Sequence, residues 1–372
     1  MMHSASSKKV GIEFSDTMLR FVSLKQERSL LVPFDYAHIS IPEGCLRDGK
    51  VTDEKRFVTF LKKVRKTHGI TAAYIALPQD ALRLVSGLLD TAVGTPTTEA
   101  LKQLLQTKTK LDPSTMTYEK NLVLHSKKGR FMQLLAASTT VTEQYLRCFI
   151  VSGITPMSFE HSLQSLVNAV IPKGQTQSAL VVVVGEYNTQ LCIVVNECVV
   201  DTLTLDEGAM VTPGQYSTTL VAAINQYYID WHTNKTYSGV VDTIKTVYLS
   251  GTALLIPGYA DYISAAVKLP VFATNTWTNC FSFEDIIPRL TFDHSIEYAV
   301  AVGLALGRGS LSVLPHKHKR HLKRKKYLRM TGVVLLSFAF GVLAGLLVAT
   351  VLFLARATPH YPVVLHKIAL WW

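Results

Sequence analysis

Both halves of this 372-residue chain open with the same pattern, a strand, a polar turn and a second strand. In the first half the pattern covers residues 10–25, and its two strands are rich in apolar and β-branched side chains. After a polar, hinge-like stretch at 173–177, the pattern returns at 180–196. Because each such unit must bury its apolar face against another layer, the repetition predicts a duplicated α/β fold of two lobes with a cleft between them.

Helical periodicity divides the rest of the body. A helix is expected after Thr52, with an apolar face formed by Phe57, Phe60, Leu61 and Val64. The segments are expected to be the first part of lobe 1 (1–79), an inserted small α/β subdomain (80–154), a helix and hinge of lobe 1 (155–177), lobe 2 (178–292), and a closing helix that returns to lobe 1 (293–310).

The C-terminal tail combines a basic stretch with a long apolar one. Residues 316–329 carry eight Lys and Arg, and the 25 residues at 331–355 carry no charge. As a helix the apolar run would be about 37 Å long, which exceeds the hydrocarbon core of a bilayer at about 30 Å. The tail is therefore predicted to be a basic linker (311–330), one transmembrane helix (331–355) and a short extracytoplasmic tail (356–372).

Charges on the two sides of the apolar run predict its orientation. Eight basic residues precede it, whereas only Arg356 and Lys367 follow it. Basic residues favour the cytoplasmic side, so we expect a single-pass protein of the inner (cytoplasmic) membrane, with the body in the cytoplasm and the C-terminus outside. Small residues at four-residue intervals are expected to form a homodimer face within the apolar helix: Ser337, Gly341, Gly345 and Ala349.

Away from the tail the charge is balanced. Ten of the 38 Lys and Arg residues follow residue 315, where there is no Asp or Glu, so the first 315 residues hold 28 basic and 27 acidic side chains. We expect no nucleic-acid partner, although a nucleic-acid arm at 316–329 is an alternative. Five scattered cysteines without a Cys-x-x-Cys pair favour buried thiols over disulfides or a metal site: Cys45, Cys148, Cys192, Cys198 and Cys280.

Five segments between residues 8 and 308 follow the order found in one protein family: 10–20, 49–70, 180–191, 247–251 with Pro257 and Gly258, and 298–306. In these segments the chain resembles PilM, a pilus-assembly family with an actin-like (ASKHA) fold that is related to the division protein FtsA. The resemblance implies that lobes 1 and 2 are the actin-like lobes. It also implies that the insertion at 80–154 is the family's small α/β interaction subdomain.

A second resemblance lies just after the closing helix. The segment Leu311-Ser-Val-Leu-Pro315, followed by a basic stretch and an apolar run, resembles the start of PilN, whose tail docks on PilM. The resemblance implies partner binding by Leu311, Val313, Leu314 and Pro315, in cis or on a neighbouring copy, with the two leucines in an apolar groove. An actin-like body joined to one apolar run is also similar to GspL of type II secretion systems.

The same superfamily cradles nucleotide phosphates in two hairpin turns. The resemblance places Ser15, where a glycine is usual, in the first turn, and Val183 where the family usually has Asp. That carboxylate would position a metal ion or the attacking water, so we expect no catalytic residue, no metal and no cofactor, with ATP binding as an open alternative. The residues expected at the nucleotide site are Ser15, Asp16, Thr17, Arg20, Gly185, Asn188, Gly208, Gly251 and Thr252.

These expectations together favour a membrane-anchored cytoplasmic scaffold of a type IV pilus or type II secretion platform. Its expected partners are the cell membrane, PilN- and PilO-like platform proteins, and the assembly motor ATPase. The alternative is an actin-like ATP-binding protein with residual ATPase or polymerising activity, similar to FtsA.

Overall fold

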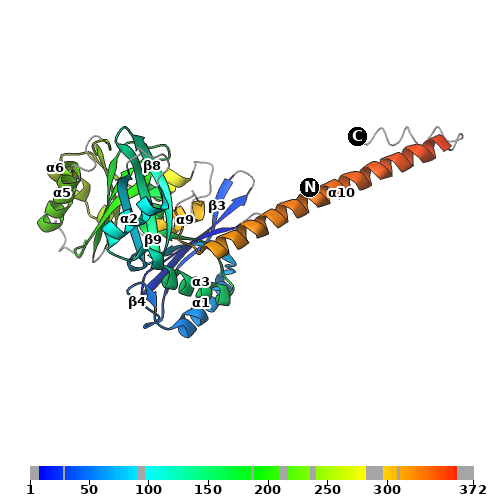
Figure 1. Cartoon of the computed structure of the whole chain (residues 1–372), viewed down its shortest axis with the longest axis horizontal. Coiled ribbons are helices and arrows are strands. Elements are labelled where there is room, and N and C mark those ends of the chain that lie inside the picture. The colour runs from blue at the N-terminus through cyan, green and yellow to red at the C-terminus, as the bar shows by residue number, and fades with distance from the viewer. Residues whose placement is uncertain are drawn as a thin grey trace. The chain divides into compact units, whose positions relative to one another are not determined.

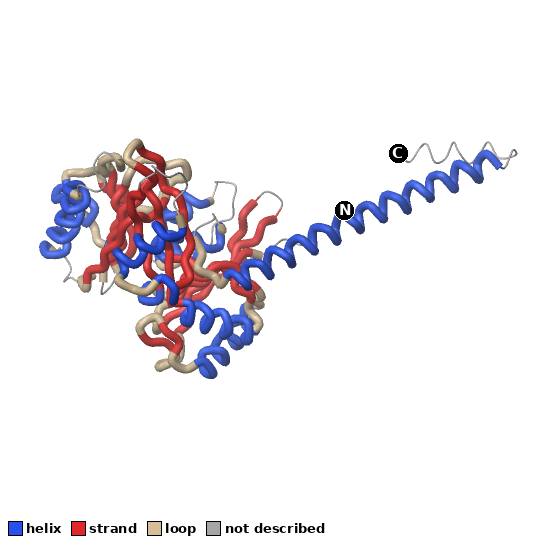
Figure 2. The backbone as a smooth tube through the Cα atoms, in the orientation of Figure 1, coloured by secondary structure: helices blue, strands red, loops and turns tan. Residues whose placement is uncertain are grey.

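The chain forms two compact units, residues 1–315 and 316–372 (Figure 1). Figure 2 shows the first unit as sheets with helices packed on them. The computed structural model describes residues 8–27, 30–89, 97–185, 188–208, 217–234, 240–281, 296–307 and 311–357.

A five-stranded sheet forms lobe 1, in the order β10-β6-β1-β2-β3. The first three strands of the chain pair antiparallel, while β1, β6 and β10 pair parallel. This arrangement confirms the strand, turn and strand expected at 10–25. The strands are β1 (Lys9–Phe14), β2 (Met18–Glu27), β3 (Leu30–Ser40), β6 (Ala72–Leu77) and β10 (Thr155–His161), and a small hairpin adds β4 (Leu46–Arg47) and β5 (Lys50–Val51).

Helix α1 (Glu54–His68) covers this sheet with the apolar face expected from its sequence, Phe57, Phe60, Leu61 and Val64, which is buried. It begins one residue later than expected, because Asp53 is the N-cap and accepts the N–H of Arg56 at 2.9 Å. Helix α3 (Thr139–Ser152), which the sequence assigns to the insertion, packs against α1.

Lobe 2 repeats the pairing of lobe 1 in a second five-stranded sheet, β13-β12-β11-β14-β15. Strand β11 pairs antiparallel with β12 and parallel with β14, just as β1 pairs with β2 and β6. The duplication expected from the sequence is therefore present. The elements are β11 (Ala179–Val184), β12 (Thr189–Val195), β13 (Cys198–Leu205), β14 (Thr246–Gly251), β15 (Val271–Ala273), α5 (Thr218–Thr233), α6 (Tyr259–Val267) and α7 (Thr276–Cys280).

The insertion is a three-stranded sheet, β7-β9-β8, with helix α2. It rests on lobe 2, because Gln133 donates to the carbonyl oxygen of Val199 at 2.6 Å and Asn196 donates to that of Val123 at 2.9 Å. The elements are β7 (Leu82–Leu89), α2 (Thr98–Thr109), β8 (Met116–Ser126) and β9 (Gly129–Ser138), with short 3-10 turns at Gln79–Ala81, Pro113–Thr115 and Thr252–Leu255.

Two helices, α4 (Ser162–Val170) and α9 (Ala299–Leu306), lie against each other between the lobes. Their contact is close, because a Cβ at Gly303 would lie 1.8 Å from the carbonyl oxygen of Ser165. Helix α9 approaches β1 just as closely, since a Cβ at Gly11 would lie 2.0 Å from the carbonyl oxygen of Ala301. Only glycine allows such approach. A shared apolar cluster joins these helices to strands β11–β13, so the core is continuous between the two lobes.

The second unit is one helix, α10 (His316–Ala357), in which the basic stretch and the apolar run are continuous. Within the part of the chain that the structure describes, no helix is long and apolar enough to cross a membrane. This finding contradicts the predicted transmembrane helix and the single-pass inner-membrane location. The apolar run is part of the 42-residue helix α10, whose first fourteen residues carry eight Lys and Arg.

The structure tests only part of the other expectations for this region. The expected linker at 311–330 is helical from His316 onwards, and most of the expected tail at 356–372 lies outside the described residues. The small residues Ser337, Gly341, Gly345 and Ala349 all fall on α10, and pairing of two copies through them stays a prediction.

Candidate functional site

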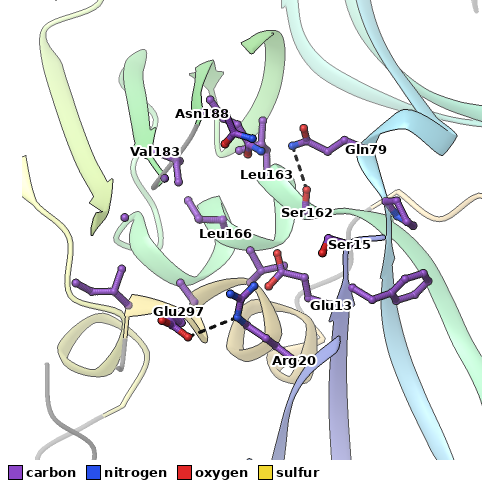
Figure 3. A pocket seen from close by; sticks show the side chains of 18 of the residues that line it. Glu13, Ser15, Arg20, Gln79, Ser162, Leu163, Leu166, Val183, Asn188 and Glu297 are labelled. Carbon is purple, nitrogen blue, oxygen red and sulfur yellow. Dashed lines mark hydrogen bonds and ion pairs between the residues drawn. The ribbon is translucent and has the colours of Figure 1, made fainter. Parts of the chain in front are cut away.

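A cavity of about 520 Å³ lies between the two lobes and is lined by both hairpin turns (Figure 3). Eight of the nine residues expected at the nucleotide site line it, from the first turn, strand β2, the second turn and the end of β14. The exception is Gly208, which lies beside Glu207, a residue whose carboxylate accepts hydrogen bonds from the hydroxyls of Ser217 and Thr219. The duplicated fold thus brings two distant turns to one cavity.

The first turn is closed by its own side chains. The hydroxyl of Ser15 accepts the N–H of Thr17 at 3.4 Å and that of Met18 at 3.2 Å. Asp16 accepts the N–H of Asp48 at 2.7 Å and that of Gly49 at 3.2 Å, so both of its oxygens hold the β4–β5 turn. The turn residues therefore have structural partners within lobe 1.

Two glycines, one in the second turn and one at the end of β14, allow close packing. A Cβ at Gly185 would lie 2.9 Å from the carbonyl oxygen of Asn188, which accepts the Gly185 N–H at 2.8 Å. Gly251 has a φ of +84°, and a Cβ there would lie 2.2 Å from the carbonyl oxygen of Val184. Thr252 donates to the same oxygen at 3.0 Å. The end of β14 is thus bound tightly to the end of β11.

The charged groups of the cavity face one another. Arg20 lies opposite Glu13 in the β1–β2 ladder, and its Nε is 3.6 Å from an oxygen of Glu297. Burial raises the pKa of Glu13 to about 7, while the Arg20 charge opposes that rise. Glu297 was missed in the sequence, because no local pattern connects it with a turn almost 280 residues away. Figure 3 also shows Gln79 donating to Ser162, at 3.3 Å.

Apolar side chains form one side of the cavity. Leu163 and Leu166 of α4, Val183 of β11, and Ala299 and Val300 of α9 line it and belong to the cluster that joins the lobes. Among the described residues, no group of three or more His, Cys, Asp or Glu could hold a metal ion. This side of the cavity is therefore apolar, whereas its carboxylates are Glu13, Asp16, Asp80 and Glu297.

The segment after α9 docks in cis on the outer edge of β10. Val313 donates its N–H to the carbonyl oxygen of Phe159 at 2.9 Å, and Phe159 donates its N–H to the hydroxyl of Ser312 at 3.0 Å. Val313 and Leu314 are fully buried, whereas Leu311 and Pro315 are only partly so. Of the two leucines expected to fill a groove, only Leu314 is fully buried, and Val313 is the second buried residue.

Comparison with known proteins addresses the fold. No protein-family model and no curated protein matches this chain. A solved structure described as a PilM-PilN type IV pilus biogenesis complex matches with a TM-score of 0.62 and 14% identity, covering 80% of this chain and 97% of that chain. The chain has an actin-like fold.

Two further structures resemble this actin-like chain. One is the cytoplasmic domain of EpsL, an inner membrane component of the type II secretion system of Vibrio cholerae, with 9% identity, a TM-score of 0.45, and coverage of 84% of this chain and 100% of that chain. The other is MreB5 of Spiroplasma citri bound to ADP, with 10% identity, a TM-score of 0.43, and coverage of 81% and 96%.

Proposed function

We propose that this protein is a non-hydrolysing actin-like scaffold of a type IV pilus or type II secretion assembly platform. The observation that carries the proposal is the valine at position 183, which lines the cavity at the end of β11 where hydrolysis would need a carboxylate. Phosphoryl transfer depends on positioning and charge stabilisation by metal ions and polar groups, and a valine supplies neither.

Three of the four carboxylates that line the cavity support the same interpretation. Asp16 is bonded to two backbone N–H groups, and Glu297 is paired with Arg20. Glu13 has a raised pKa, because its charged form is poorly solvated. Metal binding by any of these three would first have to break or offset such an interaction.

The proposed partners follow from the fold and from the docked segment. The solved structure with a TM-score of 0.62 is a pilus biogenesis complex. In the present chain a short segment, 311–315, occupies an exposed sheet edge of its own body, a mode of contact that commonly joins separate proteins. We infer that PilN- and PilO-like platform proteins and the assembly motor ATPase are the partners of the scaffold.

The test of the proposal is titration of the full chain with ATP and Mg²⁺, together with a phosphate-release assay. We expect release at the level of buffer. The control is Asn188→Trp, which places a large ring at the exposed rim of the cavity and would abolish turnover in the cavity but not turnover by a contaminating enzyme. Phosphate release by the wild type that disappears in Asn188→Trp would refute the scaffold proposal. Sedimentation that depends on ATP would favour the FtsA-like alternative.

A further inference from the structure

The outer side of α1 carries charge of one sign. Lys62, Lys63, Arg65 and Lys66 follow one another within five positions, and all four are exposed. Among the described residues none of the four forms an ion pair, whereas Glu54 at the start of the same helix is paired with Arg147 at 2.6 Å. In a body with 28 basic and 27 acidic side chains, this is a local concentration of unmatched positive charge.

Favourable interaction with the helix dipole explains only part of this pattern. Cations in the last turn of a helix are stabilised by the partial negative charge there, and Arg65 and Lys66 lie in that turn. Lys62 and Lys63 lie further from the end, where the effect of the dipole fades. Four exposed cations also repel one another, so the arrangement costs folding energy unless something else is gained.

These cations line two recesses, one on each side of helix α1. Lys62, Arg65 and Lys66 line a recess of about 490 Å³ that also includes Val151 at the end of α3. Lys63 lines a second recess, of about 480 Å³, on the side of α1 that faces β3. The apolar residues of the second recess are Ile39, Pro42, Phe60 and Val64. Because residues three and four apart share a helix face, each recess receives its own row of side chains.

One exposed apolar side chain, Val151, lines the first recess, and its chain neighbour Ile150 is exposed as well. Ile150 is 45% exposed and Val151 is 54% exposed at the C-terminal end of α3. A bilayer surface takes apolar side chains that protrude, whereas Phe60 and Val64 are buried in the wall of the second recess. A nucleic-acid backbone offers no apolar group to such a recess. Apolar side chains beside unmatched cations are complementary to a polypeptide that carries both carboxylates and apolar groups.

We propose that the outer face of α1, with its two recesses, docks an acidic segment of a partner protein whose apolar side chains enter the recesses. The carboxylates of the segment would pair with Lys62, Lys63, Arg65 and Lys66. This surface is separate from the lobe cavity and from the docked segment at 311–315, since neither contributes a residue to the two recesses. The proposal therefore stands independently of whether the cavity binds a nucleotide.

The test uses a fluorescein-labelled random copolymer of Glu and Tyr as the acidic, apolar-containing probe, and poly-Glu as the purely acidic one. Anisotropy is measured with the full chain at physiological salt. Because the basic stretch of α10 would bind any polyanion in parallel, its eight Lys and Arg residues between positions 316 and 329 are replaced by Gln in every protein compared, including the reference called wild type in this test. The double variant Lys62→Glu with Lys66→Glu should bind the copolymer about tenfold more weakly than the wild type, because two attractions become repulsions.

The matched control is Lys120→Glu with Lys127→Glu, which makes the same charge change at two exposed positions of the insertion. It should weaken binding by less than about twofold, since these residues lie outside both recesses. A third variant, Ile150→Ser with Val151→Ser, should weaken binding of the copolymer and leave binding of poly-Glu unchanged.

Three outcomes would overturn the proposal. The first is an equal effect of the two charge-reversal variants on copolymer binding, or no detectable binding in the wild type. The second is equal binding of poly-Glu and the copolymer by every variant. The third is loss of binding to vesicles with 30% phosphatidylserine in Lys62→Glu with Lys66→Glu while copolymer binding persists, which would make the surface a lipid site. Unchanged unfolding midpoints would show that the exposed substitutions leave the fold intact.

Discussion

The backbone N–H of Val313 lies 2.9 Å from the carbonyl oxygen of Phe159 and donates a hydrogen bond to it. Phe159 belongs to β10, the edge strand of the lobe 1 sheet. An uncovered edge strand exposes backbone groups that can pair with another chain. The segment at 311–315 therefore covers part of the edge that would otherwise be open, and it does so through buried side chains as well as backbone contacts.

The first prediction concerns the anchoring of this segment by Leu314. Truncation by Leu314→Ala removes a fully buried side chain and should reduce the free energy of local opening by about 2–5 kcal/mol. Hydrogen exchange at the amide of Val313 should accelerate accordingly, by a factor of about 30 or more. The control is Leu311→Ala, at a partly exposed position, which should change that exchange rate little. Equal acceleration in both variants would contradict the docking geometry.

A second prediction concerns the contact between α4 and α9. Gly303→Ala would place a Cβ 1.8 Å from the carbonyl oxygen of Ser165, so one of the helices must shift. We expect a loss of about 1–3 kcal/mol or more in the free energy of unfolding in urea, in spite of the better helix propensity of alanine. The matched control is Gly341→Ala in α10, where an added Cβ meets nothing within 4 Å. A Gly303→Ala protein as stable as the control would disprove the close contact.

A third prediction concerns the buried amide between the insertion and lobe 2. Gln133 donates to the carbonyl oxygen of Val199 at 2.6 Å and to the side-chain oxygen of Gln164 at 3.1 Å. Gln133→Leu keeps much of the volume but leaves these acceptors without that donor, which should cost about 1–3 kcal/mol.

Thermal unfolding of Gln133→Leu should therefore begin at a lower temperature than in the wild type. The control is Gln144→Leu, since Gln144 is a part-buried residue of α3 that donates to the carbonyl oxygen of Val51 and to the carboxylate of Glu54. The prediction fails if Gln133→Leu is no less stable than Gln144→Leu.

The fourth prediction concerns two adjacent residues of β10 with opposite pH dependence. Burial raises the pKa of Glu160 to about 7 and lowers the pKa of His161 to about 4. Between about pH 4.5 and 7 the folded protein holds the Glu160 proton, whereas the unfolded chain has released it. Glu160 therefore makes the unfolding free energy fall as pH rises through this range, by about 3 kcal/mol.

His161 has the opposite effect on the pH dependence of the unfolding free energy. Between about pH 4 and 6.5 the unfolded chain binds a proton at this residue that the folded protein does not, so its contribution makes the unfolding free energy rise with pH. The measurement is urea unfolding of the wild type, Glu160→Gln and His161→Asn from pH 4.5 to 7. Wild-type stability minus that of Glu160→Gln should fall with pH, and wild-type stability minus that of His161→Asn should rise. Parallel curves for all three proteins would rule out both assignments.

Patterns within single elements were correctly read from the sequence. The repeated strand, turn and strand appears in both lobes with the same pairing, and the apolar face of α1 is the one that its periodicity predicts. These features depend on residues close together in the chain, because alternation and a 3.6-residue period determine which side of an element is buried. The assignment of the turns around Ser15 and Gly185 to one cavity came instead from the resemblance to the actin-like superfamily, and both turns line that cavity.

The apolar run at 331–355 shows what cannot be predicted from the composition of one segment. Its composition predicted a transmembrane helix, and that prediction was wrong for the helix that forms, in which the run continues from the basic stretch. Hydropathy averaged over one window does not determine where a helix begins. That depends on whether the flanking residues continue the backbone hydrogen-bond ladder.

By itself the sequence determined the duplicated two-lobe architecture and placed Val183 at the end of a central strand. Only the tertiary structure decided that Asp16 supports the turn at Asp48, that Glu297 lies beside Arg20, and that Val313 is buried on β10. Each of these contacts joins segments far apart in the chain. Such contacts depend on how whole sheets and helices pack, so no local period or spacing can reveal them.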